Sequence, residues 1–281
     1  MSHLLSIEQA LIYGVKVLEG TDTARRDVRL MLSSALKQTA AYLHTWPEKR
    51  LTSVQQDVFF ALLVRLRGGE PLAYVLGEWE FWSLTLRVTK DTLIPRPETE
   101  LLVELALKLL PTETAAVADL GTGSGAIALA VATERPDIKL WATDISAAAL
   151  TVATENARSL DVNSIVFCEG FWGGALPPGK FDMVISNPPY IAPLDPHLDA
   201  DGLPFEPLSA LVSEDEGYQD IGHIIIEACC LLEPGGWLLI EHGFEQADHV
   251  RALFLASGYS NVVTHQDLSA LDRVTMGRRP T

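Results

Sequence analysis

Apolar side chains recur at helical spacing through the first 75 residues. One face of a first predicted helix carries Ile7, Leu11, Val15 and Leu18. Asp22 is placed to cap a second helix. Ser53 and Gln56 have the spacing of a capping box before a third helix over 58–66, and Gly68 can end that helix. Residues 1–75 therefore predict a small helical domain, which is either a partner-docking module or a stabilising appendage.

The pattern changes between residues 76 and 97. Aromatic and branched side chains alternate over a short stretch (Phe81, Trp82, Leu84, Leu86 and Val88), which predicts a β-hairpin linking two domains. The segment Ile94–Glu100 follows, and its two prolines on either side of Arg96 make it rigid and extended. It is either an interdomain linker that ends in a helix start or a lid over a ligand.

From residue 98 to 281, helical patterns alternate with short apolar runs. The helices are expected near 98–110, 126–134, 146–159, 217–232 and 245–257. The strands are expected at 115–120, 139–143, 164–168, 183–185, 237–240, 262–265 and 274–276. Such alternation predicts an α/β domain with a mainly parallel, doubly wound sheet of seven strands. The last two strands are joined by only Gln266–Arg273, which is too short for a crossover helix, so they should be antiparallel.

Composition adds a constraint on partners. The chain has 281 residues, of which 48% are apolar and 21% charged, and 37 Asp and Glu against 21 Lys and Arg give a net charge of −16. Residues 1–90 hold 11 Lys and Arg against 9 Asp and Glu, a net of +2, and residues 91–281 hold 10 against 28, a net of −18. Because phosphate neutralisation by cationic side chains drives most nucleic-acid binding, no direct nucleic-acid partner is expected.

Cysteine and histidine usage narrows the setting further. The three cysteines, Cys168, Cys229 and Cys230, have no framework spacing, which favours a reducing compartment. The seven histidines lack metal-ligand spacing, so no metal site is expected. Neither a secretory signal nor an apolar stretch of about 20 residues is evident, and we expect a cytoplasmic protein without membrane contact.

A glycine-rich loop carries the first functional signal. Gly121–Gly125 follows the first strand of the alternating region and opens a helix, where glycines let the backbone approach a ligand and the helix start offers free N–H groups. Asp144 ends the next strand, 19 residues after Gly125, and suits a ribose diol. A nucleoside cofactor is predicted. Ala126 also completes the dinucleotide pattern with the glycines, so this loop alone leaves the choice of cofactor open.

The second signal is Asn187-Pro188-Pro189-Tyr190, directly after the fourth strand. Ligands of open α/β sheets bind beyond the carboxyl ends of the strands, so this segment and the glycine loop should face one cleft. Asn187 can accept one N–H of a planar amide or amine through its side-chain carbonyl, and the backbone carbonyl of Pro188 can accept the other. Tyr190 can cover the flat face of the target group.

These segments resemble the HemK/PrmC family, the peptide chain release factor glutamine methyltransferases. The resemblance covers essentially the whole chain and rests on Gly77–Trp82, Leu93–Glu100, Gly121–Gly125, Asn187–Tyr190, Phe205–Pro207 and Glu241–Gly243. It implies a class I, Rossmann-like methyltransferase domain over 98–281, a β-hairpin linker over 76–97 and a helical domain over 1–75 that docks release factors.

The resemblance also implies an activity. A methyl group would pass from S-adenosyl-L-methionine to the side-chain amide nitrogen (N5) of the glutamine in the Gly-Gly-Gln loop of release factors, modulating translation termination and leaving S-adenosyl-L-homocysteine. The implied cofactor-binding residues are Gly121, Thr122, Gly123, Ser124, Gly125, Asp144, Trp172 and Asn187. Asn187, Pro188, Pro189 and Tyr190 would bind the substrate glutamine, with Asn187, Pro188 and Tyr190 catalytic. Phe171 stands where the family commonly has Asp.

Alternative functions remain open at this point. One is a glutamine N5-methyltransferase of a ribosomal protein, which needs the same cleft and a different docking part. Another is a nucleic-acid exocyclic-amine methyltransferase, which the −18 charge of residues 91–281 disfavours. A nucleotide-binding dehydrogenase or a catalytically silent cofactor sensor is disfavoured by the Asn187–Tyr190 segment. His242 is expected to have a structural role, and Glu206 either to shape the substrate mouth or to pack a loop.

Overall fold

A computed structural model describes residues 4–199 and 202–280. The chain divides into two compact units, Met1–Gly77 and Glu78–Thr281, and each is described by itself. The division falls just after the predicted helical domain and places the hairpin with the α/β unit instead of leaving it as a separate linker.

The first unit is helical. Its elements are α1 (Ile7–Val17), α2 (Ala24–Leu36), α3 (Ala40–Thr45), α4 (Ser53–Arg67) and α5 (Leu72–Leu76). Buried apolar side chains of α1, α2 and α4 form its core, including Ile7, Val28 and Phe59. The sequence pattern predicted the three long helices but missed α3 and α5, which are too short to show a helical period.

Two predicted caps of this unit are wrong by one residue. The N-cap of α2 is Thr23, whose hydroxyl donates to Asp27 at 2.5 Å, instead of Asp22. The capping box of α4 is formed by Thr52 and Gln55, instead of Ser53 and Gln56. Both neighbours are also capping residue types, so composition alone could not choose between them.

The second unit begins with the hairpin of β1 (Glu78–Phe81) and β2 (Leu84–Arg87), which is fastened to later helices. The backbone N–H of Trp82 donates to Glu100 Oε1 at 2.8 Å. The buried side chain of Asn156 accepts from the Arg87 N–H at 2.7 Å and donates to the carbonyls of Arg87 and Ser124 at 3.0 and 2.9 Å. Asn156 therefore joins the hairpin to the loop that contains Ser124.

The rest of the unit confirms the predicted fold class. The strands β3 (Ala116–Leu120), β4 (Lys139–Asp144), β5 (Ile165–Glu169), β6 (Phe181–Ser186), β7 (Leu232–Glu241), β8 (Ser260–Gln266) and β9 (Asp272–Arg278) form one seven-stranded sheet. Their spatial order is β5-β4-β3-β6-β7-β9-β8. The first five in that order are parallel, and β9 pairs antiparallel with β7 and with β8. The short connection between β8 and β9 predicted the second of these two pairings.

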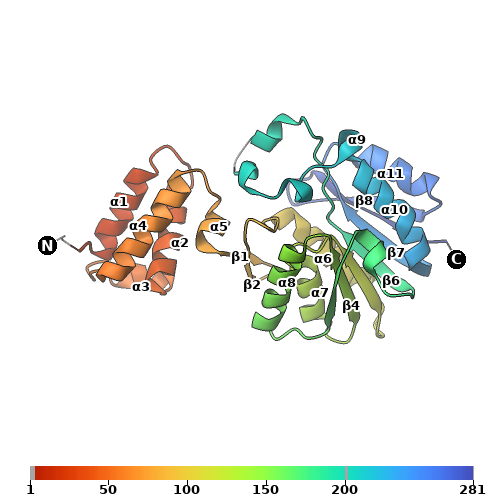
Figure 1. The fold of residues 1–281 in the computed structure, drawn as a ribbon, viewed down its shortest axis with the longest axis horizontal. Helices are drawn as coiled ribbons and strands as arrows, with labels where there is room; N and C mark the ends of the chain where they lie inside the picture. Colours follow the sequence, from red (N-terminus) through yellow and green to blue (C-terminus); the bar gives the residue numbers. More distant parts are fainter. Residues whose placement is uncertain (1–3, 200–201, 281) are drawn as a thin grey trace. The chain divides into compact units, whose positions relative to one another are not determined.

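Helices cover both faces of this sheet (Figure 1). The helices α6 (Glu100–Leu109), α7 (Ala126–Glu134) and α8 (Ala147–Ser159) pack with one set of strand side chains, such as Val117 and Leu239. The helices α10 (Gln219–Leu231) and α11 (Ala247–Ala256) pack with the alternate set, such as Leu120 and Leu238. Because both faces are covered, most residues of the central strands are buried, and these strands read as mainly apolar runs.

A segment of short helical turns lies between β6 and α10. It contains the 3₁₀ helices η3 (Pro196–Asp199), η4 (Leu203–Phe205) and η5 (Leu208–Ala210), and then α9 (Glu214–Gly217). Its ends are tied together, because Ile191 donates to the Leu211 carbonyl at 2.9 Å and Ser213 donates to the Ile191 carbonyl at 3.0 Å. This segment therefore stands directly after Asn187–Tyr190 and returns beside it.

The tether made by Asn156 gives a stability prediction. Replacing Asn156 by Ala leaves the Arg87 N–H and the Ser124 carbonyl without their buried partner, so we expect the free energy of unfolding to fall by about 2–3 kcal/mol. Urea denaturation followed by tryptophan fluorescence measures the change. The matched variant Asn163→Ala removes an exposed amide beyond the same helix and should change stability by less than about 0.5 kcal/mol. Equal losses for both variants would contradict the tether.

Candidate functional site

The glycine loop between β3 and α7 adopts a conformation that side chains rarely permit. Gly121, Gly123 and Gly125 all have positive φ, at 75°, 57° and 84°. At Gly121 an added Cβ would also lie 2.8 Å from the ring of Trp172, so an indole already fills that space. The loop therefore needs glycine for its backbone path and, at Gly121, for the close approach of a neighbouring ring.

Asp144 at the end of β4 holds this loop in place. Its Oδ2 accepts from the backbone N–H of Gly123 at 2.9 Å, and its Oδ1 accepts from that of Ser146 at 2.8 Å. Burial raises the pKa of this carboxyl, and the backbone donors oppose the rise. Each oxygen keeps a further lone pair, so the carboxylate can order the loop and still accept from a diol.

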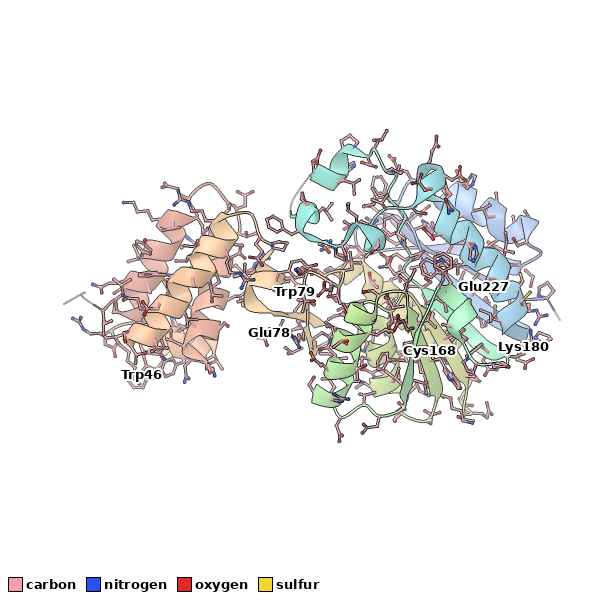
Figure 2. The ribbon with its side chains drawn as sticks, in the orientation of Figure 1. Trp46, Glu78, Trp79, Cys168, Lys180 and Glu227 are labelled. Atoms are coloured by element: carbon pink, nitrogen blue, oxygen red, sulfur yellow. The ribbon has the colours of Figure 1, made fainter. Side chains whose placement is uncertain are left out.

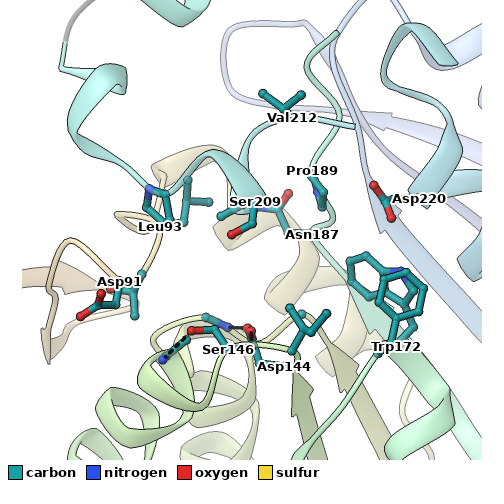
Figure 3. A pocket seen from close by; sticks show the side chains of 18 of the residues that line it. Asp91, Leu93, Asp144, Ser146, Trp172, Asn187, Pro189, Ser209, Val212 and Asp220 are labelled. Carbon is teal, nitrogen blue, oxygen red and sulfur yellow. Dashed lines mark hydrogen bonds between the residues drawn. The ribbon is translucent and has the colours of Figure 1, made fainter. Parts of the chain in front are cut away.

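A cavity of about 300 Å³ lies beyond the carboxyl ends of these strands. Figure 3 shows Asp144, Ser146 and Trp172 on one side of it and Leu93, Asn187 and Pro189 on the other. Of the predicted cofactor residues, Gly121, Gly123, Asp144, Trp172 and Asn187 line this cavity.

The remaining predicted cofactor residues lie beneath the loop. Thr122 is buried and its hydroxyl donates to Asp119 Oδ2 at 2.6 Å. Ser124 is buried as well, and its carbonyl accepts from Asn156. Gly125 is the N-cap of α7, and a Cβ added there would lie 3.1 Å from Leu129 and 3.2 Å from Ala153. These three residues support the shape of the loop instead of facing the cavity.

Trp172 forms one end of the cavity and begins the 3₁₀ helix η2 (Trp172–Ala175). Its indole Nε1 is buried and has no hydrogen-bond partner among the described residues. Phe171, which is 49% exposed, packs its ring 5.5 Å from that of Trp172 and 5.4 Å from that of His223. The backbone N–H of Gly173 donates to Glu227 Oε2 at 3.0 Å, and Figure 2 shows Glu227 on α10. Phe171 and Trp172 therefore form an aromatic wall at this end of the cavity.

A second cavity, of about 340 Å³, adjoins the first at Asn187. It is lined by Leu93, Arg96, Asn187, Pro188, Tyr190, Ile191, Leu203, Ala210 and Leu211. Asn187 lines both cavities, and its Nδ2 donates to the hydroxyl of Thr99 at 3.2 Å. The segment Asn187–Tyr190 therefore lies between the two cavities, and the Asn187 amide is a wall of both.

Tyr190 is held from two directions. Its hydroxyl lies 3.5 Å from Glu241 Oε1, and its backbone carbonyl accepts from Gln246 Nε2 at 3.1 Å. Burial raises the pKa of the phenol, and the nearby Glu241 adds to the rise. The ring is therefore neutral and fixed in position, as a platform for a planar group requires.

Glu206 joins two stretches of chain that supply walls of the second cavity. The buried carboxylate accepts from the Ile94 N–H at 3.0 Å and forms an ion pair with Arg96. It ties the rigid Ile94–Glu100 segment to the turns between β6 and α10, and both stretches supply cavity walls. Glu206 therefore has the loop-packing role, one of the two roles expected of it.

Two buried carboxyl groups were missed by the sequence reasoning as site residues. Asp119 lies in β3 and Glu241 ends β7, and burial raises the pKa of each to about 7. Asp119 Oδ1 and Glu241 Oε2 have no hydrogen-bond partner among the described residues. The available signals were a lone acidic residue within the apolar strand β3 and an acidic residue directly after the apolar run 237–240. Asp and Glu are almost never fully buried unless they are paired.

His242 has the structural role expected of it. Its Nδ1 donates to the Gly243 carbonyl at 2.9 Å, and its Nε2 accepts from the Thr275 hydroxyl at 2.8 Å. Burial lowers its pKa, so the ring is neutral. Across residues 4–199 and 202–280, no group of three His, Cys, Asp or Glu side chains could hold a metal ion. No helix in the same residues is long and apolar enough to cross a membrane.

Comparison with known proteins finds a matching family model in each unit. The family model "PrmC N-terminal domain" matches residues 9–77, and "Methyltransferase small domain" matches residues 98–200. A release factor glutamine methyltransferase of Salmonella typhimurium is 47% identical over 264 residues, covering 94% of this chain and 95% of the relative. One of Vibrio cholerae is 45% identical and covers 99% and 98%.

A solved structure supports the fold of the second unit. The crystal structure of a methyltransferase from Pyrococcus furiosus aligns with a TM-score of 0.53 and 17% identity, covering 70% of this chain and 90% of that one. At that identity the likeness concerns the fold alone.

The contact between Gly121 and Trp172 gives a binding prediction. In Gly121→Ala the added methyl group meets the indole at 2.8 Å and the positive φ becomes strained, so the affinity for S-adenosylmethionine should fall at least tenfold. Isothermal titration calorimetry measures it. Gly174→Ala, in the same short helix as Trp172 but with open space around its Cβ, should bind within about twofold of the unsubstituted chain. If Gly121→Ala also binds within twofold, the close approach does not shape the site.

Proposed function

Because the chain belongs to the family of release factor glutamine methyltransferases, we propose that it methylates N5 of the glutamine in the Gly-Gly-Gln loop of peptide chain release factors, with S-adenosylmethionine as donor. The observation that carries this proposal is the position of Asn187, which lines two adjoining cavities. One cavity has the features of a nucleoside site, and the other receives the planar group to be methylated.

The first cavity fits the proposed cofactor. Gly121 and Gly123 bring bare backbone to its wall, and Asp144 offers a carboxylate to a ribose diol. The unpartnered indole Nε1 of Trp172 and the exposed ring of Phe171 supply a donor and an aromatic surface for a flat base. S-adenosylmethionine would supply an activated methyl group on a sulfonium ion.

The second cavity fits a glutamine side chain. The backbone carbonyl of Pro188 and the side-chain carbonyl of Asn187 would accept the two amide N–H groups, and Pro188 has no N–H of its own to compete. Pro189 lines the first cavity beside Asn187, and the neutral ring of Tyr190 would cover the amide plane. The amide nitrogen is thereby aimed at the first cavity, where the methyl group would stand.

Orientation is the main contribution that these residues make. Fixing two reactants in line can lower a barrier by roughly 7–11 kcal/mol at best. The new N–C bond would form as the C–S bond breaks, the electron pair of the C–S bond would stay on sulfur, and one amide proton would pass to water. Because the positive charge on sulfur disappears, carbonyl dipoles at the nitrogen suit this reaction better than an adjacent carboxylate.

The wider setting is part of the same proposal. Residues 1–77 would dock the release factor, since the family model for that domain matches there. All three cysteines are free, which supports a reducing cytoplasmic location. A glutamine of a ribosomal protein and an exocyclic amine of a nucleic acid remain competing substrates for the test, and the −18 charge of residues 91–281 argues against the nucleic acid.

The test is a methyl-transfer assay against defined substrates. With S-adenosylmethionine, the chain should add one methyl group to a release factor and none to the same factor with Ala in place of the loop glutamine, as measured by intact-protein mass. Asn187→Ala should lower kcat/KM for the release factor at least a hundredfold, since it removes an acceptor that orients the nucleophile. Asn163→Ala is the matched control and should keep the full rate. Methylation of a ribosomal protein or of DNA in place of the release factor would overturn the proposal.

A further inference from the structure

One charged side chain lines the second cavity and has no part in the proposed reaction. Among the described residues around that cavity, Arg96 alone is charged. The reaction as proposed uses the amide of Asn187, the carbonyl of Pro188 and the ring of Tyr190, and it leaves this guanidinium unassigned. A cation at the wall of a mainly apolar cavity is costly unless it meets an acceptor, so its surroundings indicate what it binds.

The backbone fixes where the Arg96 side chain begins. Arg96 stands between Pro95 and Pro97 and has extended backbone angles, φ −98° and ψ 145°. Pro95 fixes its own φ and Pro97 keeps its predecessor extended, so the backbone here has little freedom. The Arg96 carbonyl also accepts from the Thr99 N–H at 3.1 Å. The first atoms of the side chain are therefore held in place before any substrate binds.

A buried carboxylate fixes the other end of the side chain. Arg96 Nη2 forms an ion pair with Oε1 of Glu206, whose side chain is 2% exposed, while that of Arg96 is 33% exposed. Glu206 Oε2 accepts from the Ile94 N–H at 3.0 Å, so the carboxylate is itself anchored. Within residues 4–199 and 202–280, the guanidinium makes no other hydrogen bond. Most of its five N–H groups therefore remain for water or a ligand.

The ion pair decides which acceptors suit the remaining N–H groups. The Glu206 carboxylate cancels most of the field of the guanidinium at longer range, because opposite charges in contact act there as a dipole. Nucleic-acid binding depends on cations that neutralise phosphates, and a cation already paired with a buried carboxylate gains little from one. A neutral carbonyl needs only a directed donor at hydrogen-bond distance. The arrangement therefore favours a carbonyl oxygen over a phosphate.

The second cavity has room for part of a peptide backbone beside a glutamine side chain. Its volume is about 340 Å³. The five non-hydrogen atoms of a glutamine side chain, at roughly 30 Å³ each as for water, would fill about half of it. Glycines bring a backbone close to a wall because they have no Cβ, so a Gly-Gly-Gln segment can present its carbonyls to Arg96.

We propose that Arg96 is a substrate-binding residue that donates a hydrogen bond to a backbone carbonyl of the Gly-Gly-Gln segment, and that Glu206 positions its guanidinium for this contact. This inference rests on the proposed function, and it explains how the cleft recognises a glutamine as part of a peptide. The acceptor is not a reacting atom, so the bond is equally strong before and during methyl transfer. It therefore lowers KM and leaves kcat unchanged.

The first experiment removes the guanidinium. Arg96→Met keeps an unbranched side chain without N–H groups, so KM for a Gly-Gly-Gln peptide should rise at least tenfold while kcat stays within about threefold. The affinity for S-adenosylmethionine, measured by isothermal titration calorimetry, should also stay within about threefold. Arg251→Met is the matched control and should keep both kinetic constants, because Arg251 is 34% exposed, is paired with Asp248 and lines neither cavity. An unchanged KM in Arg96→Met overturns the proposal.

The second experiment removes the acceptor instead. Three peptides each carry a trans-alkene in place of one backbone amide group, so that one carbonyl of Gly-Gly-Gln is lost and the chain shape is kept. Calorimetry with S-adenosylhomocysteine present measures their binding without turnover. One of the three should bind the unsubstituted chain at least tenfold more weakly than the natural peptide does, and Arg96→Met should weaken that one by no more than about threefold further.

This comparison holds even where Arg96→Met does not fold. If none of the three peptides binds the unsubstituted chain at least tenfold more weakly than the natural peptide, no carbonyl of the segment is bound and the proposal is overturned. If Arg96→Met folds and weakens the binding of all three peptides by more than about threefold, the guanidinium acts on something other than a peptide carbonyl, which also overturns it.

The positioning role of Glu206 is tested by two variants. Glu206→Ala releases the guanidinium, so KM for the peptide should rise at least threefold while kcat stays within about twofold. Glu206→Gln keeps a carbonyl oxygen that accepts from Arg96 and should restore KM to within about twofold of the unsubstituted chain. A fall in kcat with no change in KM would overturn the positioning role, because Glu206 would then act only through the packing of the loops.

The outcomes separate this inference from the proposed function. If the unsubstituted chain methylates neither a release factor nor the peptide, the proposed function fails, and no variant is needed to show it. If the unsubstituted chain methylates both and Arg96→Met behaves like Arg251→Met, only the role of Arg96 fails. If Arg96→Met loses affinity for single-stranded DNA and not for the peptide, the guanidinium binds phosphate and the proposal is overturned.

Discussion

The site depends on the register of four parallel strands. Leu120 of β3 is paired with Thr143 of β4 on one side and with Ser186 of β6 on the other, and Ser186 is paired with Ile240 of β7. The next residue along each strand is therefore Gly121, Asp144, Asn187 or Glu241, all at one edge of the sheet. A slip of one residue in any strand would turn its side chains to the opposite face and separate these groups.

Burial gives this edge its chemical character. Helices on both faces exclude water from the central strands, so a carboxyl group there is costly unless donors surround it. Asp144 receives the backbone N–H groups of Gly123 and Ser146, and Asp119 receives the Thr122 hydroxyl. The donors from Gly123 and Thr122 also fix parts of the glycine loop. The free energy lost by burying these acids is thus partly offset by bonds that order the ligand-binding backbone.

The sequence predicted the fold well because buried parallel strands leave continuous apolar runs, and the alternation of such runs with helices specifies the sheet. It also predicted that the glycine loop, Asp144 and Asn187 face one cleft, because each ends or directly follows a parallel strand. It did not predict the hydrogen bond between Asn187 and Thr99, which are 88 residues apart and carry no local pattern. Nor could it show that Thr122 and Ser124 lie beneath the loop, since neighbouring residues of a tight turn point to different sides.

The lining of the second cavity suits the charge change of the reaction. Methyl transfer from a sulfonium ion consumes a positive charge, so a carboxylate beside the reacting nitrogen would stabilise the reactants more than the transition state. Among the described residues, no acidic side chain lines the second cavity, and the side chain at its boundary with the first is the neutral amide of Asn187. Glu241 is buried at the end of the neighbouring strand, with the Tyr190 hydroxyl 3.5 Å from its Oε1. The acidity of the catalytic unit can then coexist with a reaction that disfavours acidity at the point of bond formation.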